Sequence, residues 1–591
     1  NNNVAIGQNA GEDLTSGTFN NFMGTNAGLN ATTADNTVAI GRQAIGLGVL
    51  TGTDNIAIGQ VSGYDLTSGS HNSFIGYAAG GNATTATNTV AIGRSAFGNG
   101  VLTGTDNTAI GFAAGFDLTS GTYNNFMGYE AGYNATTGDS NVAIGRQAIG
   151  LGVLTGSNNV VLGYQAGYDL TSGEHNILSG FQAGTNVTTG TGNIFQGNEA
   201  GEFATTASYN IAIGHTAIGS GVMTGDDNVA IGRIAGHDLT SGTKNNFIGY
   251  FAGANATTAD NTIAIGVTAI SSGVLTGTDN TAIGRLAGND LTSGTYNNFM
   301  GYNAGASATT ADYSIAIGYS AMGTGGVTGD DNTAIGRLAG QYLTSGSQNF
   351  FGGYSAGQNA TTADYGIAIG YEAIGIGVMT GVDNTAIGRQ AGNDLTSGTA
   401  NFFGGTLAGY NATTAINTVA IGKQAIGAGV LTGTDNVAIG FAAGNDLTSG
   451  DYNTFMGYIA GSNATTGQYN IGVGHSASGL GALTGSDNIS IGRNTGDDLT
   501  SGVDNTLVGH LAGRNVTTGI DNTLIGAGAG TVLTTGGNNI CIGHDAAASS
   551  SNVSNQITLG NTAIASIRAQ VTSITALSDR RDKKDIKDLS V

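Results

Sequence analysis

The sequence predicts an all-β fold, a parallel β-solenoid or β-roll, from three observations. First, a short segment of the form N-x-A-I-G recurs along almost the whole chain at intervals of 17 or 18 residues. Second, proline and tryptophan are absent, and glycine accounts for 105 of the 591 residues. Third, charged residues make up 9% of the chain, far below the ~25% of ordinary globular domains. A long, glycine-rich chain with a short internal period is typical of stacked repeats.

The repeat also has a higher-order period. The glycines that close the segment fall at 7, 24, 41, 59, 76 and 93, so steps of 17, 17 and 18 build a unit of 52 residues. An additional 17-residue turn is inserted near Gly197. About 33 turns therefore occupy residues 1–561. A single turn is too short to enclose a hydrophobic core, so each turn must stack on the next as parallel strands ~4.8 Å apart.

Residues before the strand glycine alternate between two faces of the predicted strand. The residue directly before the glycine is Ile, Met or Val, and the residue before that is Ala in two turns of three and Phe in the third. A large ring between two small residues fills space without overpacking. We expect the structural core to contain Ile6, Ile40, Ile58, Phe22, Phe74, Phe126, Phe247, Phe299, Phe351, Phe403 and Phe455.

Both faces of this strand are apolar, which is typical of a strand that is covered on both sides. One face points into the interior of the solenoid. The other face must meet something else, and an identical chain is the simplest candidate. The pattern therefore predicts a homo-oligomer.

The turns repeat as regularly as the strands. D-L-T-S-G begins at Asp13, N-A-T-T begins at Asn30, and L-T-G-x-D-N begins at Leu50. These segments supply glycines for positive φ and side chains that cap turns. Asn precedes almost every strand, which predicts an amide ladder along the stack. Arginine follows the strand glycine once per 52 residues over much of the chain, at Arg42, Arg94, Arg146, Arg233, Arg285, Arg337 and Arg389.

Charge and hydropathy exclude several functional classes. Residues 1–560 hold 11 Lys and Arg against 35 Asp and Glu, a balance of −24, which disfavours nucleic acid as a partner. No apolar run approaches the ~18 residues of a membrane span, so no membrane insertion is expected. The single cysteine, Cys541, cannot form an intrachain disulfide. Nothing in the pattern indicates a cofactor.

Most candidate ligand residues have a structural interpretation. The Asp13, Asp65, Asp117 and Asp169 column lies three turns apart, roughly 14 Å, too far for one calcium ion to bridge. Turn capping is the preferred role for this column, and calcium between chains stays open. The seven histidines lack metal-ligand spacing and are expected at surfaces or interfaces. Several tyrosines follow the strand glycine, and packing is preferred over sugar stacking for Tyr77, Tyr129, Tyr250, Tyr302, Tyr354 and Tyr458.

Two further patterns have weak functional readings. The N-A-T sequons at Asn30, Asn82 and Asn134 are explained by turn chemistry, and glycosylation would need a eukaryotic secretory setting. No unique acidic cleft interrupts the repeat, so we expect no enzyme activity on other molecules. Regular threonine rows only loosely resemble ice-binding solenoids.

The N-x-V-A-I-G-x-x-A pattern at 17-residue spacing resembles the head repeats of trimeric autotransporter adhesins and the repetitive fibres of tailed viruses. This resemblance covers residues 1–561. It implies a left-handed parallel β-roll that assembles as a homotrimer.

The remaining residues, 562–591, differ in composition and become highly charged. The pattern S-D-x-R-x-K-x-x-I, which starts at Ser578, resembles the start of the intramolecular chaperone auto-processing domain of phage tailspikes and fibres. The resemblance implies a single self-cleavage between Ser578 and Asp579, with Lys583 as the partner of the serine.

Together these patterns predict the structural shaft of a viral, phage-like tail or surface fibre that spaces and presents host-attachment regions. The expected location is the virion surface or another extracellular setting. The expected partners are identical chains and a host-surface glycan or protein receptor. The head of a bacterial trimeric surface adhesin is the main alternative, and a glycan-degrading tailspike or an ice-binding solenoid is less favoured.

Overall fold

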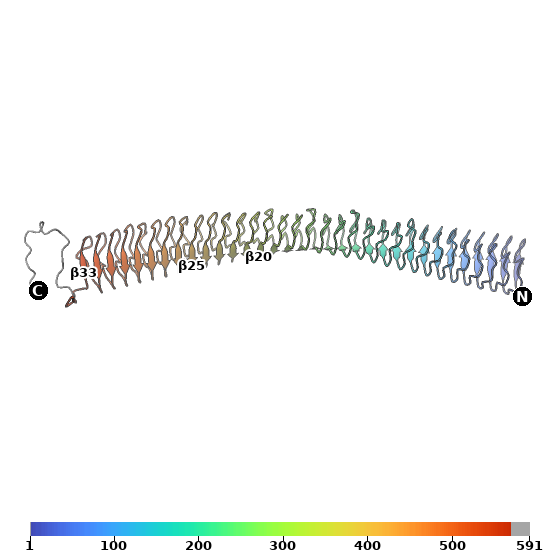
Figure 1. Ribbon diagram of the computed structural model, residues 1–591, viewed down its shortest axis with the longest axis horizontal. Helices are drawn as coiled ribbons and strands as arrows, with labels where there is room; N and C mark the ends of the chain where they lie inside the picture. The colour runs from blue at the N-terminus through green and yellow to red at the C-terminus, as the bar shows by residue number, and fades with distance from the viewer. Residues whose placement is uncertain (1, 569–591) are drawn as a thin grey trace, which may run out of the picture. The chain divides into compact units, whose positions relative to one another are not determined.

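A computed structural model describes residues 2–568 of the chain (Figure 1). The described residues form 33 strands of three residues each and contain no helix. This confirms the prediction of an all-β parallel solenoid of about 33 turns. The chain divides into two compact units at Ala415, here called the N-terminal unit and the C-terminal unit.

The strands of the N-terminal unit are β1 (Val4–Ile6), β2 (Asn21–Met23), β3 (Val38–Ile40), β4 (Ile56–Ile58), β5 (Ser73–Ile75), β6 (Val90–Ile92), β7 (Thr108–Ile110), β8 (Asn125–Met127), β9 (Val142–Ile144), β10 (Val160–Leu162), β11 (Ile177–Ser179), β12 (Ile194–Gln196), β13 (Ile211–Ile213), β14 (Val229–Ile231), β15 (Asn246–Ile248), β16 (Ile263–Ile265), β17 (Thr281–Ile283), β18 (Asn298–Met300), β19 (Ile315–Ile317), β20 (Thr333–Ile335), β21 (Phe350–Gly352), β22 (Ile367–Ile369), β23 (Thr385–Ile387) and β24 (Phe402–Gly404). Those of the C-terminal unit are β25 (Val419–Ile421), β26 (Val437–Ile439), β27 (Thr454–Met456), β28 (Ile471–Val473), β29 (Ile489–Ile491), β30 (Thr506–Val508), β31 (Thr523–Ile525), β32 (Ile540–Ile542) and β33 (Ile557–Leu559).

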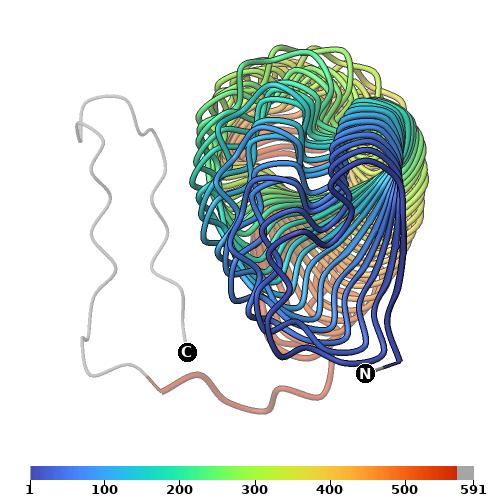
Figure 2. The ribbon, with the colours of Figure 1, turned by 90° about the vertical axis from the view of Figure 1, so that its right-hand side faces the viewer.

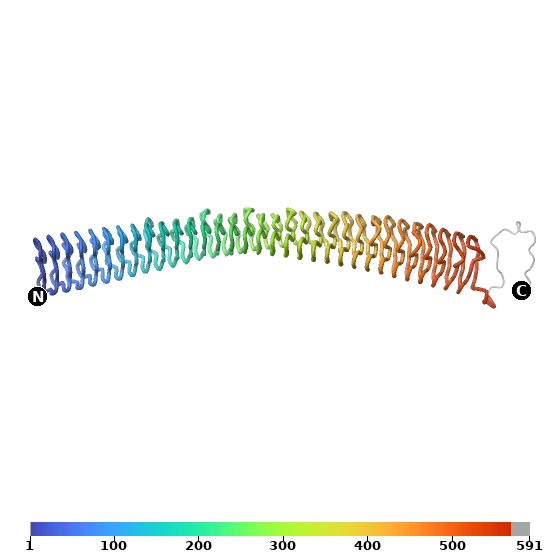
Figure 3. Tube along the Cα trace, turned by 180° about the vertical axis from the view of Figure 1, so that it is seen from behind, coloured from blue at the N-terminus to red at the C-terminus, as the bar shows by residue number. Residues whose placement is uncertain are grey.

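Within each unit, every strand pairs in parallel with the strand of the next coil, so one coil contributes one rung (Figure 3). The register places equivalent residues opposite one another. Phe126 of β8, for example, pairs with Ala109 of β7 and Ala143 of β9. Seen end-on, successive coils of the N-terminal unit overlie one another as similar loops (Figure 2). A column of equivalent side chains therefore runs along the stack at the ~4.8 Å strand spacing.

The glycine that ends each strand is required by both conformation and space. Gly128 has a φ of +141°, and a Cβ atom there would lie 2.5 Å from the carbonyl oxygen of Gly145 in the next coil. Any other residue at this position would clash with the neighbouring backbone through its Cβ atom. Residues other than glycine also rarely adopt this φ. This close approach explains why the strand glycine marks the repeat in the sequence.

The 52-residue period follows from packing around the phenylalanine rings. Phe126 is fully buried, and Cβ atoms at Gly115 and Gly132 would lie 2.7 to 2.8 Å from its ring. The ring thus needs small residues in its own coil and in the preceding one. In the third coil of the period, the position equivalent to Gly115 and Gly132 is occupied by Ile149. This residue is fully buried and has a φ of +52°. A left-handed conformation costs such a residue ~1–2 kcal/mol, which burial of its side chain offsets.

Within the single chain, the aromatic and the aliphatic members of the predicted core differ in burial. The following phenylalanines are at most 1% exposed: Phe22, Phe74, Phe126, Phe247, Phe299, Phe351, Phe403 and Phe455. By contrast, Ile6 is 56% exposed, Ile58 is 37% exposed, and Ile40 is half-buried. The reason is the strand alternation: the isoleucines project from the opposite face, away from the interior of their own coil.

The asparagine that precedes most strands builds the predicted amide ladder. Asn124 is fully buried, and its Nδ2 donates to Oδ1 of Asn107 (3.1 Å) and to the carbonyl of Gly138 (2.8 Å). Its own Oδ1 accepts from the backbone N–H of Asn141 at 2.9 Å. The ladder satisfies backbone groups that would otherwise be buried without partners.

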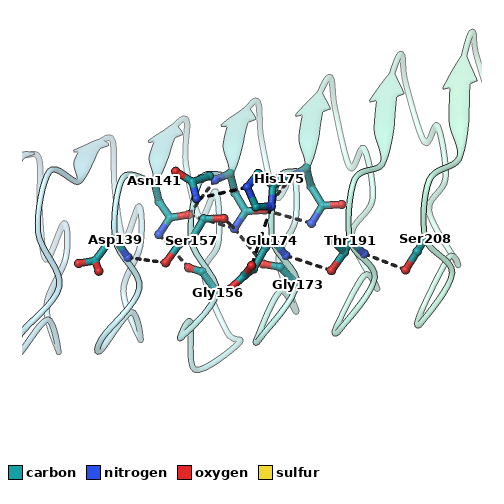
Figure 4. Close-up of polar contacts among 12 residues, drawn as sticks. Asp139, Asn141, Gly156, Ser157, Gly173, Glu174, His175, Thr191 and Ser208 are labelled. Atoms are coloured by element: carbon teal, nitrogen blue, oxygen red, sulfur yellow. Dashed lines mark hydrogen bonds and ion pairs between the residues drawn. The ribbon is translucent and has the colours of Figure 1, made fainter.

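A second polar column, two residues before the ladder asparagine, caps the turn in many coils (Figure 4). The backbone N–H of Asp139 donates to Oγ of Ser157 at 3.0 Å, and that of Thr191 donates to Oγ of Ser208 at 3.1 Å. In other coils a carboxylate plays this part, as where Thr122 N–H donates to Oδ1 of Asp139 at 2.6 Å. Side-chain capping of the turns is therefore confirmed, and each cap is supplied by the next coil.

Candidate functional surface

The outward face of the strands carries a long series of large apolar side chains. The residue directly before the strand glycine defines what we call the outer row. Ile58, Ile75 and Ile92 in three successive coils are 37%, 38% and 37% exposed. The outer row is apolar in 20 of the 24 strands of the N-terminal unit and is broken at Ser179, Gln196, Gly352 and Gly404. A continuous apolar surface of this kind usually marks an interaction site.

Exposed apolar side chains at the first strand position, such as Ile56 and Ile367, lie on the same face as the outer row, whereas those of the turns are arranged differently. Val101 is 55% exposed and Val153 is 54% exposed, and both lie in turns of the 18-residue coils. Such coils occur once per 52 residues, so these side chains are separated by roughly 14 Å along the stack. Only the outer row has an apolar side chain in nearly every coil.

A second outward row follows the strand glycine, and we call it the aromatic–cation row. Phe112 and Tyr129 in adjacent coils stack with centroids 5.1 Å apart and an interplanar angle of 12°. In the next coil, Cζ of Arg146 lies 5.6 Å from the ring centroid of Tyr129 and 5.7 Å from the ring centroid of Tyr164. The six tyrosines singled out from the sequence lie in this row and are between 38% and 51% exposed. Their packing against neighbouring side chains is confirmed, although it leaves much of each ring in solvent.

The aspartates of the D-L-T-S-G segments do not have the turn-capping role that the sequence suggested. Those that form side-chain hydrogen bonds accept them from other side chains: Asp117 accepts from Asn99 Nδ2 at 2.6 Å, and Asp446 from Asn445 Nδ2 at 2.9 Å. The backbone caps come instead from the column that contains Asp139. Partial burial raises the pKa of Asp169, as it does for Asp65 and Asp394.

The histidines and the N-A-T asparagines lie at the surface of the coils. His71 and His175 side chains are 59% and 61% exposed. Asn30 Nδ2 donates to the carbonyl of Leu47 in the next coil at 2.8 Å, so this column links coils. Residues 2–568 contain no group of three or more His, Cys, Asp or Glu arranged to hold a metal ion. Over the same part of the chain, no helix has the length and apolar character to cross a membrane.

One departure from the repeat was missed in the sequence. In the C-terminal unit, buried Ser478 stands where other 18-residue coils place a large apolar residue, and its Oγ donates to Oγ of buried Ser490 at 2.8 Å. Nearby, Asp497 is fully buried and accepts from Oγ of Ser476 at 2.5 Å. The signal was available as polar residues at aligned core positions. Each group has a protein partner, so the cluster is a satisfied polar core.

The residues implied in self-cleavage, Ser578, Asp579 and Lys583, lie outside the described residues. Comparison with known proteins adds no family, because neither a protein-family model nor a curated protein matches this chain. Function must therefore be argued from the two outward rows.

Proposed function

We propose that this chain is the shaft of a homotrimeric viral fibre, which spaces host-attachment regions from a particle at the virion surface. The observation that supports this proposal is the exposed outer row. In the proposed trimer the coils are left-handed, as in the adhesin heads and fibres that the repeat resembles, and the outer rows of three chains pack against one another.

The energetics of the outer row are sufficient for assembly. Full burial of one isoleucine stabilises by ~1.5–3 kcal/mol, and about two fifths of the residue is still exposed in most members of the outer row. Covering that remainder contributes about 1 kcal/mol per coil, on the order of 20 kcal/mol over the N-terminal unit. This exceeds the ~4–15 kcal/mol lost in association.

The spacing role follows from the repetition. Consecutive coils are joined by strand pairs, and many of them also by the amide ladder and by side-chain caps, so the described residues of each unit form a regular stack. A stack of many such coils suits a protein that sets a distance. The same residue types recur in coil after coil along the chain, which fits a structural role better than a single catalytic centre.

The native mass tests the assembly directly. We expect a species of three times the chain mass of 58.4 kDa, visible as unbranched fibres by electron microscopy. Ile75→Lys with Ile92→Lys should dissociate it, because two charges would be buried in each outer row. The matched control is Val101→Lys with Val153→Lys, which places the same charges on isolated exposed side chains. A wild-type monomer, or equal effects of both variants, would refute the proposal.

A bacterial trimeric adhesin head would share this assembly, so a second experiment separates the two functions. The coding sequence beyond residue 591 should encode an intramolecular chaperone in a viral fibre and a coiled-coil stalk with a membrane anchor in an adhesin. If the chaperone is present, expression of that longer chain should give a product cleaved after Ser578. Ser578→Ala should then abolish cleavage, as shown by intact mass.

A further inference from the structure

The aromatic–cation row concentrates most of the positive charge of an otherwise acidic protein. Residues 1–560 contain 11 Lys and Arg, and nine of them stand directly after a strand glycine. These nine are Arg42, Arg94, Arg146, Arg233, Arg285, Arg337, Arg389, Lys423 and Arg493. The two exceptions are Lys244 and Arg514. A protein with a charge of −24 over these residues thus carries a narrow basic stripe.

The longest run of this row is a continuous stack over seven successive coils. Arg94 lies 5.7 Å from the rings of both Tyr77 and Phe112, so its guanidinium is held between two aromatic faces. Arg146 is held in the same way between Tyr129 and Tyr164. The run ends at Phe181, which stacks on Tyr164 at 5.2 Å. The rings of Tyr77, Phe112 and Phe181 are 49%, 39% and 45% exposed.

Stacking leaves the donors of these guanidinium groups available. A guanidinium with both faces covered by rings keeps its N–H groups at the edge of its plane, in a fixed orientation. Within residues 2–568, all four ion pairs involve histidine, so neither Arg94 nor Arg146 has a carboxylate partner. A carboxylate of the same coil as Tyr129, that of Glu130, accepts a hydrogen bond from Gln147 Nε2 at 2.9 Å. The two arginines are therefore preorganised donors without an acceptor.

We propose that this row binds a linear acidic polysaccharide whose carboxylates are widely spaced. Exposed aromatic rings present flat apolar faces on which pyranose rings stack. Each intervening guanidinium accepts one carboxylate in bidentate geometry. Arg94 and Arg146 are three coils apart, about 14 Å, so a carboxylate is needed only about once in every two or three sugar units.

The same spacing argues against nucleic acid, which also stacks on aromatic rings. A nucleic acid carries a phosphate at every nucleotide, so most of its charges would face acidic protein surface and not arginine. Sparse carboxylates avoid that repulsion. Several short runs on one chain, and more in an oligomer, would raise the overall affinity through multivalency. This binding role goes beyond the proposed spacing role and does not depend on it.

The test uses the full chain and short hyaluronan oligosaccharides, with calorimetry to count the molecules bound per chain. The control ligand is the carboxyl-reduced oligosaccharide, which keeps the sugar backbone and lacks the charge; we expect it to bind at least tenfold more weakly. Arg94→Gln with Arg146→Gln should remove the binding equivalent of one run. Lys244→Gln with Arg514→Gln changes the net charge equally outside the row and should bind like the wild type. Tyr129→Leu should also weaken binding while keeping both arginines.

Several results would overturn the proposal. One is an equal loss of hyaluronan binding in the two double variants. Another is equal affinity for the carboxyl-reduced and the unmodified oligosaccharide. The others are no binding at millimolar oligosaccharide, and tighter binding of poly(dT) than of hyaluronan at the same salt concentration. A change of native mass in the Arg94 and Arg146 variant would instead place the row in an assembly interface and would refute it too. Loss of glycan binding alone leaves the shaft proposal unaffected, because that proposal is read from the native mass of the wild type.

Discussion

Replacing Phe126 tests whether the 52-residue period is a packing period. The ring is fully buried and contacts two glycines whose added Cβ atoms would lie within 2.8 Å of it. Phe126→Ala should leave a cavity, because Ala109 and Ala143 in the paired strands are too small to fill the space. Truncation of a buried phenylalanine costs ~3–5 kcal/mol. The neighbouring coils should lose the same local stability, because each coil depends on the next.

Hydrogen exchange measures this loss coil by coil, which a single unfolding midpoint of a long repeat protein does not. At tenfold per ~1.4 kcal/mol, amides in β7, β8 and β9 should exchange roughly a hundredfold to a few thousandfold faster. Amides in β18 serve as the internal reference and should not change. Phe126→Leu is the matched control, because Leu178 occupies the equivalent buried position in β11; its cost should be ~1.5 kcal/mol or less.

A double variant sharpens the test. Gly132→Ala alone should destabilise through a clash with the ring and through its φ of +62°. In the Phe126→Ala background the clash is absent, so the second substitution should cost less than it does in the wild type. Unchanged protection in Phe126→Ala, or additive effects of the two substitutions, would refute the packing explanation.

Three further predictions concern polar groups. Asn124→Leu should destabilise its coil by ~1–3 kcal/mol for each backbone group that loses its partner. Asn124→Thr should cost less, because several coils carry Thr at this position. Equal losses of protection in the two variants, measured by hydrogen exchange, would contradict the ladder. Asp169→Asn should equal or slightly exceed the wild type in thermal stability at pH 7, because burial raises the pKa of this carboxyl and disfavours its charged form. The difference in stability between the variant and the wild type should vanish when the pH falls below 3.8, the ordinary pKa of an aspartate. Lower thermal stability of the Asp169→Asn variant than of the wild type at pH 7 would show that the charge of Asp169 is not destabilising. Ser490→Ala should destabilise by ~1–3 kcal/mol by orphaning the Ser478 hydroxyl, and Ser478→Ala in that background should recover part of the loss; a further loss in the double variant would show that the pair is not coupled.

The repeat was predictable because each coil imposes its own requirements on the sequence. The strand glycine is fixed by a carbonyl 2.5 Å from its missing Cβ at Gly128, and the buried asparagine at Asn124 is fixed by backbone partners. The glycine recurs in every coil and the asparagine in most of them, so both appear as a period that can be read without coordinates. The alternation of Phe and Ala on one strand face was readable for the same reason.

The sequence did not decide which apolar face is the interior. Ile58 and Phe74 are both large and apolar, yet Ile58 is 37% exposed and Phe74 is fully buried. The distinction depends on the direction in which the coil closes, which strand alternation alone does not fix. The capping column was also misassigned, because Asp65 and Asp139 are both turn aspartates and only the stacking of coils brings one of them to a backbone N–H. The departure at Ser478 and Asp497 was readable but hidden among small polar residues.

By itself, the sequence determined the solenoid, its number of coils and the columns into which side chains fall, because a short period leaves no other way to bury apolar surface. Only the tertiary structure decided what those columns touch. It showed that Arg94, Arg146 and Arg337 each lie between two aromatic rings, and that none of the three has a carboxylate partner among the described residues. It also showed that the isoleucine column faces outward. Both facts depend on how far apart side chains of successive coils lie in space, which their spacing along the chain does not specify.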